Sequence, residues 1–174
     1  MFPTGGFIDA LDIPGVGSIE ATLINAGNPT IFVNANTLGL SGIELQDDVN
    51  ANSELLKTLE TIRAHATVAM GLAASAQEAS EKRPHTPKLA FISGAKTYTA
   101  SSGKVVAKEA IDITARIMSM GKLHHAMTGT GAIAIAVAAA IPGTIVSLAL
   151  GGKSQSTVKF GHPSGTLAVG AEAE

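Results

Sequence analysis

The chain of 174 residues contains no cysteine. This absence excludes a disulfide framework, a thiolate metal site and a cysteine nucleophile. An excess of one charge sign is missing as well, because 12 basic and 14 acidic residues are mixed along the chain, for a formal net charge of −2. Without a broad cationic face, nucleic acid is excluded as a partner.

Membrane-spanning runs and export signals are also absent from the sequence. The apolar run Ala132–Ile141 has ten residues, which is too short to span a bilayer. The first residues, Met-Phe-Pro-Thr-Gly-Gly, have neither the basic flank nor the apolar core of a signal peptide. We therefore expect a cytoplasmic protein with no membrane partner. Since 45% of its residues are apolar, the chain can bury one core, and we expect a single domain over residues 1–174.

Alternating residues and turn signals predict a mixture of strands and helices. We expect strands over residues 15–24, 31–33, 88–93, 110–118, 144–150, 157–160 and 166–169. A leucine-rich stripe predicts a long amphipathic helix that begins at Asn52 or Ser53 and ends near Gly71. Several short strands and one apolar helix indicate the α+β class, in which a curved, mostly antiparallel sheet or barrel wraps around a central helix.

The central helix is predicted over Gly129–Ile141. From its fourth residue on it has no polar side chain, so we expect it to be apolar on every face and surrounded by other elements. Pro142-Gly143 ends it. The first backbone N–H groups of a helix have no partner inside the helix. Together with the helix dipole, those of Gly129, Thr130 and Gly131 favour a carboxylate or a phosphate.

Basic residues lie close to the start of this helix. Capping by Thr128 explains the glycine turn without any ligand, but it does not explain Lys122, His124 and His125 a few residues earlier. We therefore favour an anion site at this position. Adjacent histidines point in different directions on a strand, and no nearby carboxylate completes a ligand set, so we expect no metal.

The turn Gly161–Gly165 is the second candidate cluster. By default it is a polar turn between strands, whereas as a functional site it supplies His162 and the hydroxyl of Ser164 as ligand contacts. No Asp–His relay accompanies Ser164, which disfavours a serine hydrolase. Asn28 is by default a plain turn residue, unless the fold places it beside the helix start.

Three segments of the chain, with several weaker matches, resemble a known family. They are Asn25–Thr30, Ser119–Met127 and Phe160–Leu167, with weaker matches at residues 44–48, 60–63, 85–88 and 139–143. Over nearly the whole chain they are similar to the C-terminal half of the 2-methylaconitate cis-trans isomerase (PrpF) family. The resemblance places the chain in the diaminopimelate epimerase superfamily, which has two similar domains, each a sheet rolled around a central helix, with the active site between them.

The resemblance implies proton transfer beside a carboxylate of a small unsaturated di- or tricarboxylate, without a cofactor. This chemistry needs a base, an acid and fixed positive dipoles. In the epimerases a cysteine at each helix start transfers the proton, and Thr128 occupies that position here. In the methylaconitate isomerases the proposed catalytic lysine and cysteine belong to the N-terminal half. We expect that domain, and the usual C-terminal tail, to be missing from this chain.

Two interpretations remain open. In the first, the chain is the substrate-clamping half of an isomerase. Its expected substrate contacts are Asn28, Lys122, Met127, Thr128, Gly129, Thr130, His162 and Ser164. In the second, it is an isolated domain that binds anions or self-associates without turnover. The substrate is also open between 2-methylaconitate, 4-oxalomesaconate and methylitaconate. We expect homo-oligomers, because a half that faces another domain exposes apolar surface.

Overall fold

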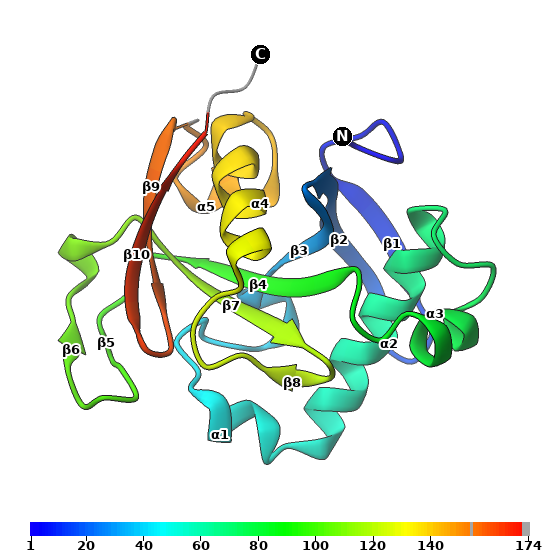
Figure 1. Ribbon diagram of the computed structural model, residues 1–174, viewed down its shortest axis with the longest axis horizontal. Helices are drawn as coiled ribbons and strands as arrows, with labels where there is room; N and C mark the ends of the chain where they lie inside the picture. The colour runs from blue at the N-terminus through cyan, green and yellow to red at the C-terminus, as the bar shows by residue number, and fades with distance from the viewer. Residues whose placement is uncertain (154, 172–174) are drawn as a thin grey trace.

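The computed structural model describes residues 1–153 and 155–171, and its main feature is an open sheet of eight strands (Figure 1). Seven strands follow the order β1-β2-β3-β4-β7-β9-β10, and β8 pairs with β7. Their bounds are β1 (Asp9–Ile13), β2 (Gly17–Ala26), β3 (Asn28–Asn34), β4 (Lys88–Gly94), β7 (Ile113–Ser119), β8 (Lys122–Leu123), β9 (Thr157–His162) and β10 (Gly165–Gly170). Neighbours are antiparallel except for the pairs β3–β4 and β7–β9, which are parallel.

The α+β class and the mostly antiparallel sheet are confirmed, but a closed barrel is not formed. The sheet ends at β1 on one side and at β10 on the other, and no pairing joins these two edges in the described part of the chain. Helix α4 (Gly129–Ala140) contacts β9 and β10 as well as β2 and β3. It stands between these two pairs of strands (Figure 1).

Helix α4 is buried over most of its surface, as its sequence predicts. Ala134, Ile135 and Ala138 are fully buried in a core that α4 shares with the sheet. Ile133, in contrast, is 53% exposed. The expectation that α4 is covered on every face was therefore wrong, because the described chain leaves the side of Ile133 open.

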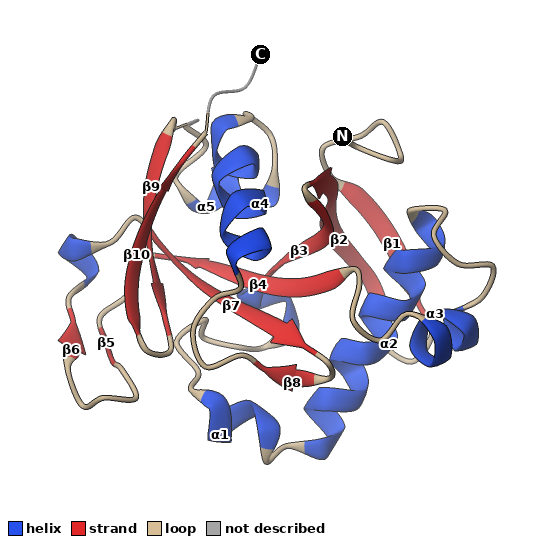
Figure 2. Ribbon diagram, in the orientation of Figure 1, coloured by secondary structure: helices blue, strands red, loops and turns tan. Residues whose placement is uncertain are grey.

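A second layer of helices covers the other face of the sheet (Figure 2). Its main element is α2 (Ser53–Ala69), whose first turn is capped by the side chain of Asn52, one of the two caps that the sequence predicts. Alternate residues of the central strands enter the two layers: Phe91 packs on the α2 side, whereas Ala90 and Ile92 pack on the α4 side. The shorter elements are α1 (Gln46–Asn50), α3 (Ala76–Lys82), the 3-10 turns η1 (Ala35–Leu38) and η2 (Lys108–Ala110), and the hairpin of β5 (Tyr98–Thr99) and β6 (Val105–Val106).

The strand expected over residues 144–150 is wrong, because this segment forms helix α5 (Ile145–Ala149). Thr144 caps it by accepting a hydrogen bond from the backbone N–H of Ser147 at 3.1 Å. The Thr144 hydroxyl also donates to the carbonyl oxygen of Ala138 at 2.7 Å, which folds α5 back against the end of α4. A short apolar run fits a strand and a buried helix equally well, and here the cap and the tertiary contact select the helix.

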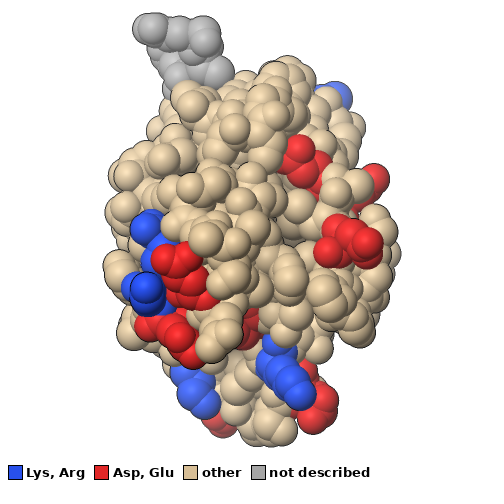
Figure 3. All heavy atoms as spheres, turned by 90° about the vertical axis from the view of Figure 1, so that its right-hand side faces the viewer, with Lys and Arg blue, Asp and Glu red and all other residues tan. Residues whose placement is uncertain are grey.

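Within the described residues, no helix combines the length and the apolar character needed to cross a membrane. Figure 3 shows the face on the right of Figure 1, where acidic and basic side chains lie close to one another among uncharged ones. This face has no broad cationic patch.

Candidate functional site

The start of α4 has backbone donors that the described protein atoms do not use. Thr128 caps the helix: its Oγ1 accepts from the N–H of Gly131 at 3.0 Å, and its carbonyl oxygen accepts from Ala132 at 2.9 Å. The N–H groups of Gly129 and Thr130 have no acceptor among the described residues. They remain available for an anion, as the sequence predicts.

Gly131 sets the position of this helix start on the sheet. A Cβ atom at Gly131 would lie 2.6 Å from Cδ1 of Ile117 on β7 and 3.1 Å from the sulfur of Met127. A side chain at this position would force Ile117, Thr128 or Met127 to shift, so glycine suits the close approach of the first turn of α4 to β7. Met127 itself is partly buried and packs against the α4 core, so it closes one side of the helix start.

The two histidines before α4 form a stacked pair, with ring centroids 4.5 Å apart. The backbone N–H of His124 donates to the carbonyl oxygen of Ile117 at 2.9 Å, and its Nδ1 accepts from the N–H of Ala126 at 3.0 Å. Burial, His125 and Lys88 lower the pKa of His124. His124 is therefore neutral at pH 7, and its remaining hydrogen-bonding atom, Nε2, carries the proton.

The turn between β9 and β10 lies directly against this loop. Nδ1 of His162 accepts from the N–H of Ser164 at 3.2 Å, and the Ser164 hydroxyl donates to the carbonyl oxygen of His125. Burial, Arg116 and His125 lower the pKa of His162, so this ring is also neutral with its proton on Nε2. The fold thus joins the two clusters that the sequence singles out.

Residues on the opposite face of the sheet hold this turn in place. The hydroxyl of Tyr98 lies 2.7 Å from the carbonyl oxygen of His162 and 2.8 Å from that of Gly165, and donates to them. Nη1 of Arg116 donates to the carbonyl oxygen of Gly161 at 2.9 Å, and its guanidinium lies 4.9 Å from the centroid of the Tyr98 ring. Burial lowers the pKa of Arg116 to about 10, and it remains charged at pH 7.

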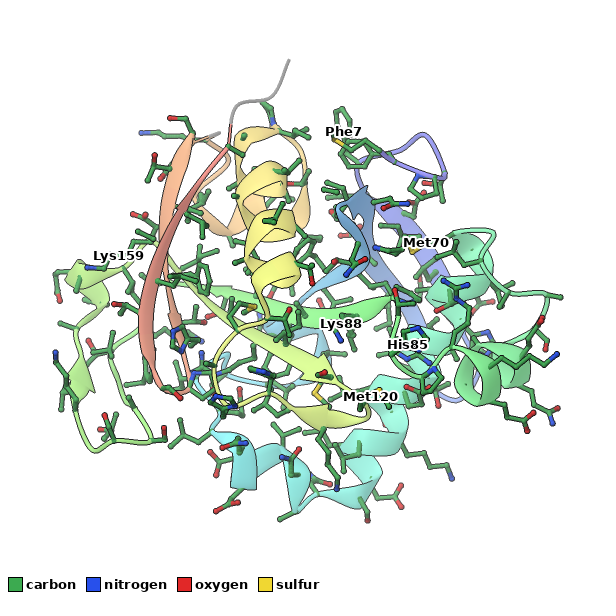
Figure 4. All side chains as sticks on the ribbon, in the orientation of Figure 1. Phe7, Met70, His85, Lys88, Met120 and Lys159 are labelled. Carbon is green, nitrogen blue, oxygen red and sulfur yellow. The ribbon has the colours of Figure 1, made fainter. Side chains whose placement is uncertain are left out.

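Lys88 is a member of the site that sequence reasoning missed. It begins β4, and its Nζ donates to Oγ of Ser119 and to the carbonyl oxygen of His85, each at 3.2 Å. Figure 4 shows Lys88 and His85 close to Met120, which follows β7. A lysine at the first position of a buried strand was the available signal, but sequence alone does not show that the strand begins beside α4.

The remaining expected contacts lie on the sheet near Lys88. Lys122 is exposed on β8 and pairs with Ser119. Asn28 is exposed at the start of β3, two residues before Thr30, which pairs with Lys88. These residues gather where β3 and β4 begin and β7 ends, whereas His162 and Ser164 approach from β9 and β10.

Lys88 lines a small pocket at the edge of the site. The other lining residues belong to α2, to the loop before β4, to Leu89 and Met118 on β4 and β7, and to the β7–β8 turn. The volume of this pocket, about 20 Å³, fits a single water molecule. Two further pockets lie between α2 and α3, and between α1 and Ser101. The described residues contain no group of three or more His, Asp or Glu side chains placed to hold a metal ion.

A family model described as PrpF protein matches residues 1–174. The chain belongs to the PrpF family. Among curated proteins it is 58% identical over 173 residues to a 2-methyl-aconitate isomerase of Shewanella oneidensis, covering 99% of this chain and 43% of that protein. It is 38% identical over 171 residues to a 3-methylitaconate isomerase of Eubacterium barkeri, covering 97% and 45%. The chain therefore spans less than half the length of these PrpF-like relatives.

Solved structures agree with this family. A crystal structure of methylitaconate-delta-isomerase superposes with a TM-score of 0.94 at 37% identity, covering 99% of this chain and 45% of that one. A probable proline racemase from Agrobacterium radiobacter superposes with a TM-score of 0.51 at 15% identity, covering 97% and 43%. The second likeness shows a shared fold only.

Proposed function

We propose that this PrpF-family chain is the substrate-binding half of an isomerase that acts on small unsaturated di- or tricarboxylates. The observation that carries the proposal is the pair of unused N–H groups at the start of α4, beside Lys88 and the stacked histidines. Donors and positive charge in this arrangement fit a carboxylate. Its relatives of known name are isomerases of such compounds.

The residues of this half fit the binding of negative charge better than the transfer of a proton. The Thr128 hydroxyl is used for capping, and a threonine is a weak base at neutral pH. His124 uses Nδ1 as an acceptor and so presents a neutral Nε2–H donor, whereas the ring of His162 also interacts with the backbone of Thr166. Such a donor stabilises an enolate-like oxygen. We infer that the base and the acid come from the part of the longer relatives that residues 1–174 do not match.

We further infer a domain arrangement of the diaminopimelate epimerase type. Residues 1–174 form one domain whose open sheet rolls around α4, and a second domain faces the start of α4. The exposed side of Ile133 is consistent with a facing domain. The proton transfer proceeds without a cofactor.

2-Methylaconitate is the first candidate substrate. Two relatives named 2-methyl-aconitate isomerase are 58% and 55% identical to the chain. The relatives named for 3-methylitaconate and (4E)-oxalomesaconate are 38% and 26% identical. A second function, an anion-binding domain without turnover, is favoured by the use of the Thr128 hydroxyl as a helix cap.

Complementation tests the proposal. The 174-residue chain alone should not isomerise 2-methylaconitate, because proton transfer needs a base within hydrogen-bond reach. Addition of the part of the Shewanella oneidensis isomerase that has no counterpart here should restore part of the activity, and Lys122→Ala or Asn28→Ala should reduce it. Turnover by the chain alone that Thr128→Val abolishes would refute the assignment of proton transfer to the missing part.

A further inference from the structure

Lys88 is a positive charge that the described protein does not neutralise. Its two hydrogen-bond acceptors, the hydroxyl of Ser119 and the carbonyl oxygen of His85, are both uncharged. The ion pairs of the described residues are Arg63–Glu60 and Lys82–Glu78, and neither includes Lys88. An ammonium group has three protons to donate, so one donor of Lys88 is free.

Lys88 lines a small pocket together with Arg63 and with Glu60, which forms an ion pair with Arg63. Burial and the charge of Arg63 lower the pKa of Lys88, and Lys88 in turn lowers the pKa of His124. Arg63 is already satisfied by Glu60 and by backbone carbonyl oxygens, which leaves it no free donor to attract a ligand. Partial burial of a cation without a counter-ion carries a desolvation cost. A bound anion would offset that cost by pairing with the ammonium group.

Strand register places Lys88 on the side of the sheet that carries α4. Within β4, Ala90 and Ile92 pack in the α4 core, and Lys88 shares their parity. The same parity on β7 puts Ser119 beside Ile117, over which the first turn of α4 lies. Ala90, two residues after Lys88, pairs with Ile117, which lies under the first turn of α4. Two residues along a strand span about 7 Å, so the backbone of Lys88 lies about 7 Å from that of Ala90.

Lys88 differs in this respect from Lys122, the lysine that the sequence singles out. Lys122 is exposed and makes no side-chain hydrogen bond to the described residues, so binding a ligand would cost it more conformational freedom. Two hydrogen bonds already hold the ammonium group of Lys88. A preorganised cation binds an anion with a smaller entropic cost.

We propose that Lys88, positioned by Ser119 and His85, binds one carboxylate group of the ligand through its free N–H, while the start of α4 receives another. This inference rests on the proposed function, and it names the residue that selects a ligand with two separated carboxylates. A monocarboxylate reaches only one of the two positions, and affinity should therefore rise steeply from mono- to dicarboxylates.

Binding of trans-aconitate to the 174-residue chain tests the inference. Calorimetry at low salt, with NMR shifts of the Lys88 side chain, should show binding that Lys88→Met weakens about tenfold or more. Lys88→Arg should retain part of the affinity. Lys159→Met is the matched control, since Lys159 is an exposed lysine on β9 (Figure 4) and lies away from the site. The affinity of this variant for trans-aconitate should stay within about twofold of that of the unmodified chain.

Several outcomes would overturn the inference. They are the absence of any Lys88 shift at saturating ligand, an equal loss of affinity in Lys88→Met and Lys159→Met, or the same affinity for acetate as for trans-aconitate. An amide spectrum of Lys88→Met like that of the unmodified chain excludes misfolding as the cause of a loss. Turnover is measured separately in the complementation experiment, so carboxylate binding by Lys88 without restored turnover would refute only the isomerase proposal.

Discussion

The hydroxyl of Ser164 donates a hydrogen bond to the carbonyl oxygen of His125, 39 residues earlier in the chain. This bond joins the β9–β10 turn to the loop that leads into α4. It therefore couples the position of His162 to that of the stacked histidines. The geometry of the candidate site depends on this contact between two segments that are distant in sequence.

Ser164→Ala should loosen the loop before α4. The variant loses one hydrogen bond to a partly exposed carbonyl oxygen, and we expect the free energy of unfolding to fall by about 0.5–1.5 kcal/mol. Urea unfolding measures this change, and faster amide exchange at residues 125–128 would locate it. Ser102→Ala, in an exposed turn, is the control. Equal exchange rates in Ser164→Ala and the unmodified chain would show that the contact does not hold the loop.

Two glycines at the start of α4 should respond oppositely to alanine. A Cβ at Gly131 would meet Ile117 at 2.6 Å and Oγ1 of Thr128 at 2.7 Å, whereas a Cβ at Gly129 meets nothing within 4 Å. Gly131→Ala should therefore destabilise the protein by about 1–3 kcal/mol through overpacking. Gly129→Ala should stabilise it by up to about 1 kcal/mol through helix propensity. Thermal unfolding distinguishes the two, and a stabilised Gly131→Ala variant would contradict the close contact with β7.

The cap of α4 should have a measurable stabilising effect. Thr128→Ala removes the acceptor of the Gly131 N–H, and loss of an N-cap costs about 0.5–2 kcal/mol. Thr130→Ala, inside the same first turn, is the control and should change stability by less than about 0.5 kcal/mol. Similar urea midpoints for the two variants would mean that Thr128 does not act as the cap.

Stability should fall as the solution becomes mildly acidic. The pKa values of His124 and His162 are lowered in the folded protein by burial and by nearby positive groups, whereas the pKa of an unfolded histidine is about 6.5. Below that pH the unfolded chain binds more protons than the folded one. The free energy of unfolding should therefore decline as pH falls from 7.5 through the lowered pKa values.

Unfolding in urea at several pH values measures this decline, and histidine NMR shifts assign it. Replacing both rings by glutamine should flatten the pH dependence. A bound carboxylate ligand should raise both pKa values, because it adds negative charge beside the rings. If either ring titrates at or above about 6.5 in the free protein, its assignment as a neutral donor is wrong.

The isolated chain should self-associate through β10. Charged residues protect the other edge strand, where β1 carries Asp9 and Asp12, but β10 has no charged residue and its Leu167 is 40% exposed. An unprotected edge is a template for pairing with another strand. Ala168→Lys should shift the chain toward monomer in sedimentation experiments, while Ala10→Lys, on β1, should not. A monomeric chain at high concentration would contradict this prediction.

The sequence alone determined the elements whose signals are local. Asn52, one of the two caps predicted for its helix, and Thr128 cap the two long helices, because a cap depends only on the residues of one turn. Strands β2, β3, β4, β7, β9 and β10 appear where alternation, β-branched residues and turn signals predict them, because these signals are local to each strand. The motifs that resemble the PrpF family can also be recognised in the sequence alone, and the family model matches residues 1–174.

Only the tertiary structure decided features that depend on distant partners. The segment before Leu150 became a helix because Thr144 contacts Ala138, and the N–H of Ile145 donates to Thr22 on β2. Helix α4 contacts β2 and β3 as well as β9 and β10, which are distant in sequence. Lys88 joined the site because β4 begins beside the end of β7. Local patterns cannot encode such pairings, since their free energy comes from contacts that exist only after the chain has folded.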